Sequence, residues 1–188
     1  MAQPMRPLRA DAARNRARVL EVAYETFAAE GLSVPIDEIA RRAGVGAGTV
    51  YRHFPTKEAL FAAVIENRMQ QAAEEGHALL KSEGPGEAIF AFLRSIVLQW
   101  GATDRGLVDA LAGFGIDIAS AAPGAEEAFL AVLGELLRAA QQAGTARPDI
   151  GVGEVKAILV GCQAMEAYNS AVAERVTDVV VDGLRAAR

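Results

Sequence analysis

The sequence predicts an all-α protein built from about nine helices. Of its 188 residues 52% are hydrophobic but only 6% are aromatic, and much of the apolar content is alanine, which favours helix over strand. Apolar residues recur at three- and four-residue spacing, and segments rich in Gly or Pro separate the runs. No strand pair is indicated, and a chain of this length and hydrophobicity is expected to bury a core.

The first predicted helix covers residues 11–30. Val19, Leu20 and Phe27 fall on one face at helical spacing, and Gly31 ends the run. Residues 1–10 contain two prolines and are expected to form a flexible arm.

Two short helices are predicted next, at about 36–43 and 47–54. Pro35 suits a first helical turn, and the acidic residues after it complement the helix dipole. Gly44 ends the first of the two helices and supplies the left-handed backbone that a sharp turn requires. Residues 11–56 are therefore predicted to form a three-helix helix-turn-helix domain.

Longer helices are expected in the rest of the chain. Thr56 can cap a linking helix over 57–80, and a strong breaker near residue 84 opens a second helical domain over 82–188. Its helices are expected at about 87–102, 105–118, 125–143, 152–169 and 171–187. The run Val179–Val181 also fits a strand, but the wider apolar spacing around it favours helix.

Charge is unevenly distributed along the chain. The net charge of −5 argues against a nucleic-acid partner for the chain as a whole. Residues 1–68, however, hold ten Lys or Arg against eight Asp or Glu, and five arginines precede Glu21. Residues 69–188 hold nine against sixteen. A polyanionic partner is expected for the N-terminal part alone, where the arginines supply salt-dependent affinity or reach a minor groove.

The segment 36–54 has the pattern of a helix-turn-helix that reads DNA. The second helix of such a pair enters the major groove, and the first lies across the backbone. Small residues at the start of the second helix permit close approach, while hydroxyl and basic side chains supply phosphate or base-edge contacts. The candidate DNA-binding residues on the second helix are Ala47, Gly48, Thr49, Tyr51, Arg52 and His53.

Alternative interpretations remain open for several of these residues. Tyr51 could pack against the first helix, and His53 could be an ordinary exposed histidine. Arg41 and Arg42 fit charges on a solvated face better than residues that read bases.

Residues 14–68 resemble the TetR family of transcriptional repressors. The resemblance centres on IARRAGVGAGTVYRHFPTKEALFAAVI. It implies that Thr49, Tyr51 and His53 face DNA and that Lys57, at the start of the next helix, meets a phosphate. The segment WGATDRGLVDAL at 100–111 and the last residues of the chain are similar to family members with SbtR-like C-terminal domains.

The sequence departs from this family at two helix starts. Pro35 stands where the family usually has Thr or Ser, and Gly46 stands where it usually has Ser. Both changes remove a hydroxyl that would cap a helix and touch phosphate. Gly is a tolerable cap and Pro a tolerable first residue, so the fold is expected to survive.

The last two predicted helices are expected to form a homodimer interface. Small residues permit close helix approach, and valines form a stripe, so two helices from each subunit would make a four-helix bundle. The candidate interface residues are Gly161, Ala164, Val172, Val176, Val179, Val180 and Leu184. The alternative is that this stripe belongs to the core of a monomer.

The resemblance also implies a pocket for a small-molecule effector in the C-terminal domain. The candidate lining residues are Phe92, Trp100, Phe114, Phe129, Leu133, Met165 and Tyr168. Because little charge lies among them, an apolar or aromatic compound is favoured. The alternative for each residue is simple core packing.

Together these features predict a cytoplasmic, ligand-responsive repressor that binds a near-palindromic DNA operator as a homodimer and is released by the effector. One rival is a helical interaction module without DNA binding; another is an activator or ligand-independent regulator of the same fold. Catalysis is not expected, because His53 and His77 are the only histidines and no metal set, nucleophile motif or complete phosphate loop occurs. No cofactor, metal or membrane partner is expected, and the lone Cys162 fits a reducing compartment.

Overall fold

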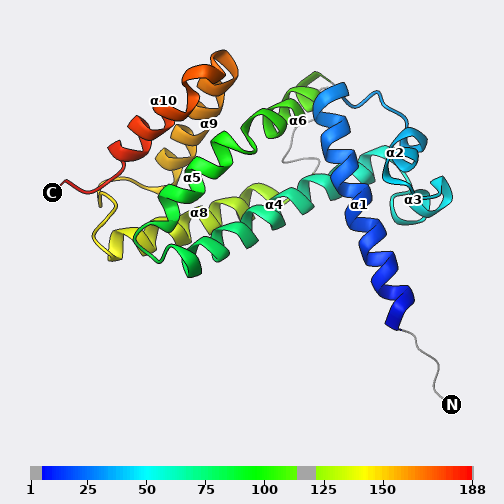
Figure 1. The fold of residues 1–188 in the computed structure, drawn as a ribbon, viewed down its shortest axis with the longest axis horizontal. Coiled ribbons are helices and arrows are strands. Elements are labelled where there is room, and N and C mark those ends of the chain that lie inside the picture. The colour runs from blue at the N-terminus through cyan, green and yellow to red at the C-terminus, as the bar shows by residue number, and fades with distance from the viewer. Residues whose placement is uncertain (1–5, 114–121, 188) are drawn as a thin grey trace. The chain divides into compact units, whose positions relative to one another are not determined.

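The protein is all-α, as predicted. The structure, a computed structural model, describes residues 6–113 and 122–187, which form nine helices and no strand (Figure 1). The helices are α1 (Arg6–Glu30), α2 (Ile36–Ala43), α3 (Ala47–His53), α4 (Lys57–Ser82), α5 (Ala88–Leu98), α6 (Gly101–Gly113), α8 (Ala125–Gln142), α9 (Val152–Tyr168) and α10 (Ser170–Gly183). No helix among the described residues is both long and apolar enough to cross a bilayer.

The chain divides into two compact units. Unit 1 comprises residues 1–67 and 106–123, and unit 2 comprises residues 68–105 and 124–188. Because α4 and α6 each run across this division, both units are built partly from the same two helices.

Unit 1 is held together by a small apolar core under α1, α2 and α3. Phe27 of α1, Ile39 of α2 and Leu60 of α4 are completely buried, and the Phe27 and Phe61 rings lie 5.8 Å apart. The end of α1 also lies close to the backbone of α6, because a Cβ on Gly106 would lie 2.5 Å from the carbonyl oxygen of Ala28. Only glycine allows this approach without a backbone shift.

Unit 2 packs α5 against α8, α9 and α10 around a second core. This core includes Phe92, Leu133 and Leu136, which are completely buried. Gly76 of α4 lies beside α8, where an added Cβ would be 2.8 Å from a methyl carbon of Val132.

Within the described residues, helix ends lie more than two residues from their predicted positions at three places along the chain. Helix α1 begins at Arg6 instead of Asp11, because a proline at position 7 is tolerated in a first turn whose N–H groups have no helical partner. Helix α5 ends at Leu98, and α6 begins at Gly101 instead of Arg105, so the glycine separates two helices that the apolar spacing alone did not divide correctly.

The third difference lies at the end of α10, which stops at Gly183 short of the predicted residue 187. The backbone after it pairs instead with residues 145–147. The Arg147 N–H donates to the Leu184 carbonyl at 3.0 Å, and the Ala186 N–H donates to the Thr145 carbonyl at 2.8 Å. The run Val179–Val181 lies in α10, as the helical interpretation predicted.

A buried ion pair joins α4 and α6 within unit 2. Arg68 is 3% exposed, and its Nε and Nη2 donate to the two Asp104 carboxylate oxygens at 2.8 and 3.0 Å. Its guanidinium also lies 4.5 Å from the centre of the Trp100 ring. The fork geometry and the cation–π contact offset part of the cost of burying this charge.

Asp104→Ala is expected to lower the free energy of unfolding by about 3 kcal/mol, because it removes the carboxylate facing a buried guanidinium. Urea unfolding followed by circular dichroism measures the change. Glu66→Ala, an exposed acidic residue two positions before Arg68, serves as the control and should cost less than about 0.5 kcal/mol. Equal stability of the two variants would contradict the role given to the ion pair.

Candidate nucleic-acid interface

The turn between α2 and α3 consists of residues 44–46. Gly44 has φ +69°, and its N–H donates to the Arg41 carbonyl at 3.2 Å, while the Val45 N–H donates to the Ala40 carbonyl at 3.0 Å. This is the Schellman arrangement, in which a left-handed residue satisfies the last carbonyls of a helix. The chain reverses within three residues, so α3 starts immediately beside the end of α2.

Packing then determines which side of α3 faces outward. Val50 is 1% exposed, and Phe54, one turn later, is 3% exposed. Both lie toward the core of unit 1, and the Arg16 guanidinium of α1 lies 5.5 Å from the centre of the Phe54 ring. With this side buried, the opposite side of α3 is left in solvent.

The solvent-facing side of α3 carries the residues predicted to bind DNA. Gly48, Tyr51, Arg52 and His53 are exposed, with 44% of Tyr51 accessible. Ala47 and Thr49 are half-buried at its edges. Thus the structure gathers these six residues on one short helix, with glycine and alanine at its start and large polar side chains toward its end.

Tyr51 faces α2 rather than the protein interior. Partial desolvation, the charge of Asp37 and a hydrogen bond with that carboxylate raise the pKa of the Tyr51 phenol. The phenol is therefore neutral at physiological pH. It can donate and accept hydrogen bonds at the surface.

Lys57 is held by a contact that the sequence did not predict. Its Nζ donates to the Leu32 carbonyl at 2.7 Å, in the segment after α1. The half-buried ammonium therefore ties the start of α4 to the end of α1. Thr56 caps α4 as predicted, since its hydroxyl accepts the Ala59 N–H at 3.1 Å.

Arg41 and Arg42 take part in a charged network on the outer side of α2. Glu38 accepts hydrogen bonds from Arg41 at 2.7 Å and from Arg42 at 2.8 Å, and Arg42 also pairs with Glu30 of α1. The bonds from Arg41 and then Arg42 lower the pKa of Glu38 to about 2. Each of these arginines thus has a carboxylate partner within unit 1.

The two helix starts that depart from the family pattern lack side-chain caps. Pro35 and Gly46 each occupy the N-cap position without a side-chain hydrogen bond. Only backbone bonds remain there, such as that from the Thr49 N–H to the Gly46 carbonyl at 2.8 Å. A Cβ on Gly46 would find nothing nearer than the Thr49 hydroxyl at 4.0 Å, so a side chain fits there.

The residues predicted to line an effector pocket occupy different environments in unit 2. Phe92 and Leu133 are completely buried, and Trp100 and Phe129 are partly buried against the same core. The Phe92 and Phe129 rings lie 6.3 Å apart. Met165 and Tyr168 are instead exposed on α9, by 38% and 92%, and Phe114 lies outside the described residues.

Most residues predicted for the dimer interface lie at the surface of α9 and α10. Gly161, Ala164 and Val179 are exposed, and Val172, Val176 and Val180 are half-buried. Leu184 is 5% exposed and packs in the core of unit 2. Val160 of α9, which was not among the predicted interface residues, is also exposed, by 55%. Its position one residue before Gly161 on α9 was the signal that could have identified it.

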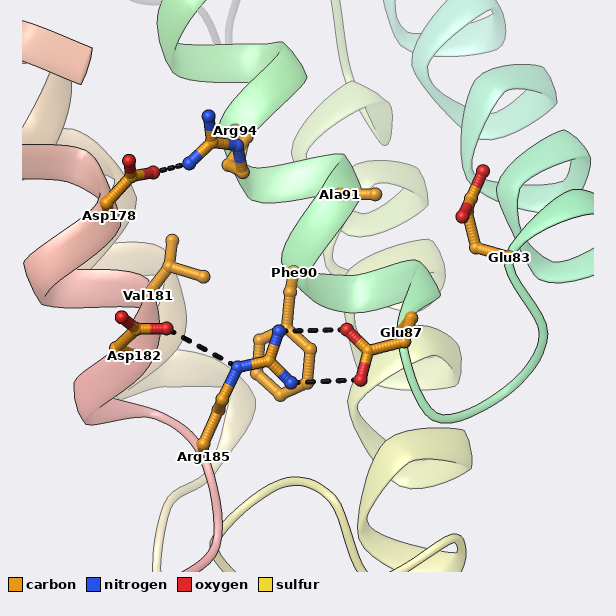
Figure 2. A pocket seen from close by; sticks show the side chains of 9 residues that line it. All are labelled: Glu83, Glu87, Phe90, Ala91, Arg94, Asp178, Val181, Asp182 and Arg185. Atoms are coloured by element: carbon orange, nitrogen blue, oxygen red, sulfur yellow. Dashed lines mark hydrogen bonds and ion pairs between the residues drawn. The ribbon is translucent and has the colours of Figure 1, made fainter. Parts of the chain in front are cut away.

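A surface cavity of about 430 Å³ lies in unit 2 beside α5 and α10, and none of the predicted effector residues that the structure describes lines it (Figure 2). Arg185 crosses it and donates to both Glu87 carboxylate oxygens at 2.9 and 2.8 Å, above the Phe90 ring at 4.0 Å. Arg94 pairs with Asp178 along the same wall. The Arg185 pair connects the segment after α10 to the residue before α5, and the Arg94 pair connects α5 to α10. They account for the polar lining of the cavity.

Comparison with known proteins identifies the chain. Residues 19–64 match the pattern described as bacterial regulatory proteins, tetR family, and residues 84–186 match the transcriptional regulator SbtR-like C-terminal domain. The chain belongs to the TetR family. It is a transcriptional regulator with a DNA-binding helix-turn-helix domain, and the resemblance seen in its sequence is confirmed.

Solved structures support the TetR assignment across nearly the whole chain. A TetR transcription regulatory protein from Mycobacterium vanbaalenii is 63% identical, with a TM-score of 0.81, over 95% of this chain and 99% of the other. A TetR transcriptional regulator from Streptomyces coelicolor is 34% identical, with a TM-score of 0.78, over 92% and 99%. Curated HTH-type transcriptional regulators of Staphylococcus aureus are 42% identical over 60 residues, which is 31% of this chain. The match covers about a third of those relatives' length, 32%.

The open position at Gly46 gives a test of the α3 start. Gly46→Ser should stabilise the protein by a few tenths of a kcal/mol, because its hydroxyl can accept the otherwise uncapped N–H groups. Gly46→Ala adds the same Cβ without the hydroxyl. It should be less stable than the serine variant by about 1 kcal/mol. Urea unfolding compares the two, and equal stabilities would show that no cap forms.

Proposed function

We propose that this TetR-family regulator is a repressor that binds a near-palindromic DNA operator as a homodimer and is released by a small, apolar effector. In this proposal residues 11–56 read DNA, residues 57–80 link the two functions, and residues 82–188 dimerise and bind the effector. The observation that carries the proposal is the outward side of α3. Within this seven-residue helix Val50 is buried, and the other six residues are the candidate DNA-binding residues, four of them exposed and two half-buried.

Reading DNA requires side chains of two kinds on this helix. Gly48 and Ala47 let the start of α3 approach the groove closely, and Thr49, Tyr51 and Arg52 offer hydrogen-bonding groups to base edges or phosphates. His53, at the end of α3, is proposed to contact a phosphate. Lys57 already donates one hydrogen bond to the Leu32 carbonyl. Because an ammonium has three donors, it can also donate to a phosphate of the DNA backbone.

A homodimer is supported by the apolar surface of α9 and α10. Val160 and Val179 leave large apolar side chains in solvent, and a Cβ on Gly161 would have no neighbour within 4 Å. Exposed apolar patches of this kind mark interaction surfaces. Pairing the two helices with their symmetry mates would bury the patch in a four-helix bundle and place two copies of α3 for successive major-groove faces.

The effector is proposed to bind in unit 2 near Phe92 and Phe129, whose rings already contact one another. The neighbouring side chains are mostly apolar, which favours an apolar or aromatic compound. Met165, Tyr168 and Phe114 are retained as candidate contacts. An effector bound there shifts the population toward dimers whose α3 helices no longer match the groove.

The signal is proposed to travel along α4 and α6, the helices shared by both units. Arg68 and Asp104 join these helices within unit 2, and Gly106 lies against Ala28 within unit 1. Gly106 follows Asp104 by two residues on α6. A shift of α6 in unit 2 is therefore proposed to act on the end of α1 through Gly106. An activator, or a regulator that needs no effector, would use the same DNA contacts, and reporter assays in both directions distinguish these alternatives.

Tyr51→Ala should weaken binding to the operator by at least tenfold, because an exposed residue of α3 loses all its polar and ring contacts with DNA. Gel shifts with the upstream region of the protein's own gene measure the affinity. Melting temperature should stay unchanged, since the ring is not part of the core. Arg138→Ala, an exposed cation of α8, is the control and should bind as the wild type does. Equal affinity of the Tyr51 and Arg138 variants would refute the DNA-reading role of α3.

Val179→Asp should convert the dimer to a monomer, because it places a charge in a surface proposed to be buried between subunits. Val108→Asp makes the same change at a residue of α6 that is 46% exposed and should leave the dimer intact. Analytical ultracentrifugation at micromolar concentration measures both. A monomeric wild type, or a dimeric Val179→Asp protein, would contradict the proposed interface.

A further inference from the structure

The N-terminal part of α1 extends beyond the core that the rest of the helix packs against. Residues 11–18 are all exposed, and burial begins at Val19 and Leu20. In Figure 1 this part of α1 reaches past α2 and α3 of the same unit. These exposed turns gain little from packing and are helical as the continuation of the packed part of α1. This feature calls for a partner outside the chain.

The extension carries a net positive charge, which favours a negatively charged partner. Residues 6–18 contain five arginines and one aspartate, Asp11, in a chain whose net charge is −5. Asp11 pairs with Arg14 at the surface, and exposed pairs of this kind contribute little stability. Arg18 is exposed one helical turn after Arg14. The complementary surface is a dense array of negative charge, as in a nucleic-acid backbone.

The extension is tied to the recognition helix within unit 1. Arg16 lies over the ring of Phe54, the residue directly after α3. When α3 occupies a groove, the extension is therefore held near the same duplex. At about 1.5 Å per residue, thirteen helical residues reach roughly 20 Å, the length of about six base pairs.

The helical state decides how these arginines can contact DNA. A helix with its side chains is about 10–12 Å wide, whereas the minor groove is about 6 Å wide. A helical extension therefore cannot enter the minor groove in the way an extended arm can. Of the two modes expected from the sequence, salt-dependent phosphate contact is the one that the helix permits.

We propose that residues 6–18 of α1 form a helical arm that binds the phosphates of double-stranded DNA flanking the segment read by α3. The inference rests on the proposed DNA-binding function and adds a second, sequence-independent contact surface to it. The arm raises affinity for any duplex that extends past the recognition site. It does not alter which bases are preferred.

The test measures operator affinity against salt concentration for the double variant Arg14→Gln, Arg18→Gln. Glutamine keeps helix propensity and removes charge. The matched control, Lys81→Gln with Arg138→Gln, removes two exposed positive charges from unit 2. Each variant is assayed on a duplex limited to the base pairs whose identity affects binding and on one extended by about one helical turn, about 10 bp, at each end.

The salt slope is the slope of log binding constant against log salt concentration, and each phosphate contact contributes about −0.9 to it. On the extended duplex the arm variant should make this slope less negative by about 2, because it loses two contacts. On the short duplex the slope should change little, and the control should match the wild type on both. The ratio of operator to random-sequence affinity should be preserved. An unchanged slope on the extended duplex, or an equal loss on both duplexes, would overturn the helical arm while leaving operator binding intact. Failure of the wild type to bind the operator would overturn the proposed function and this inference together.

Discussion

The burial of Val50 and Phe54 under α1 and α2 is the constraint on which the rest of the interface depends. Gly44 lets the chain reverse in three residues, and the two apolar anchors then leave α3 one orientation in which its polar residues face water. Helix propensity alone would not hold a seven-residue helix. Tertiary packing does so, and the same packing displays Tyr51 at the surface. The stability of the small core and the exposure of the candidate DNA-binding residues therefore depend on the same packing in unit 1.

A second constraint operates where the two units share helices. The Arg68 side chain of α4 is buried, and it forms an ion pair with Asp104 of α6. Two residues later Gly106 lies against the backbone of α1. A buried ion pair is weak evidence for stability, because desolvation offsets attraction, but it specifies one geometry strongly. The Arg68–Asp104 pair therefore fixes the position of α6 along α4 within unit 2.

The sequence predicted the fold class and the helix-turn-helix well, because local signals and tertiary packing agree there. The Gly44 turn, the Thr56 cap and the apolar spacing around Phe27 all indicate the same structure. Predictions were weaker where tertiary contacts decide. The end of α10 depends on pairing with residues 145–147, and the Lys57 bond to Leu32 joins positions 25 residues apart. Residues 6–10 were predicted to belong to a flexible arm because Pro4 and Pro7 suggest a loop, although proline is also accepted in a first helical turn. The sequence pattern did not predict the Arg68–Asp104 pair, because a buried arginine in a helix cannot be distinguished from a surface arginine by residue spacing alone.

The central claim is that two α3 helices, held by one dimer, read successive faces of the same duplex. Selection of bound DNA from a random pool by the full-length protein, followed by footprinting of the enriched duplexes, tests it most directly. We expect two inverted half-sites whose centres are separated by one helical turn, about 10 bp, or a multiple of it. Enrichment of a single unsymmetrical half-site, or no enrichment above random sequence, would contradict the account.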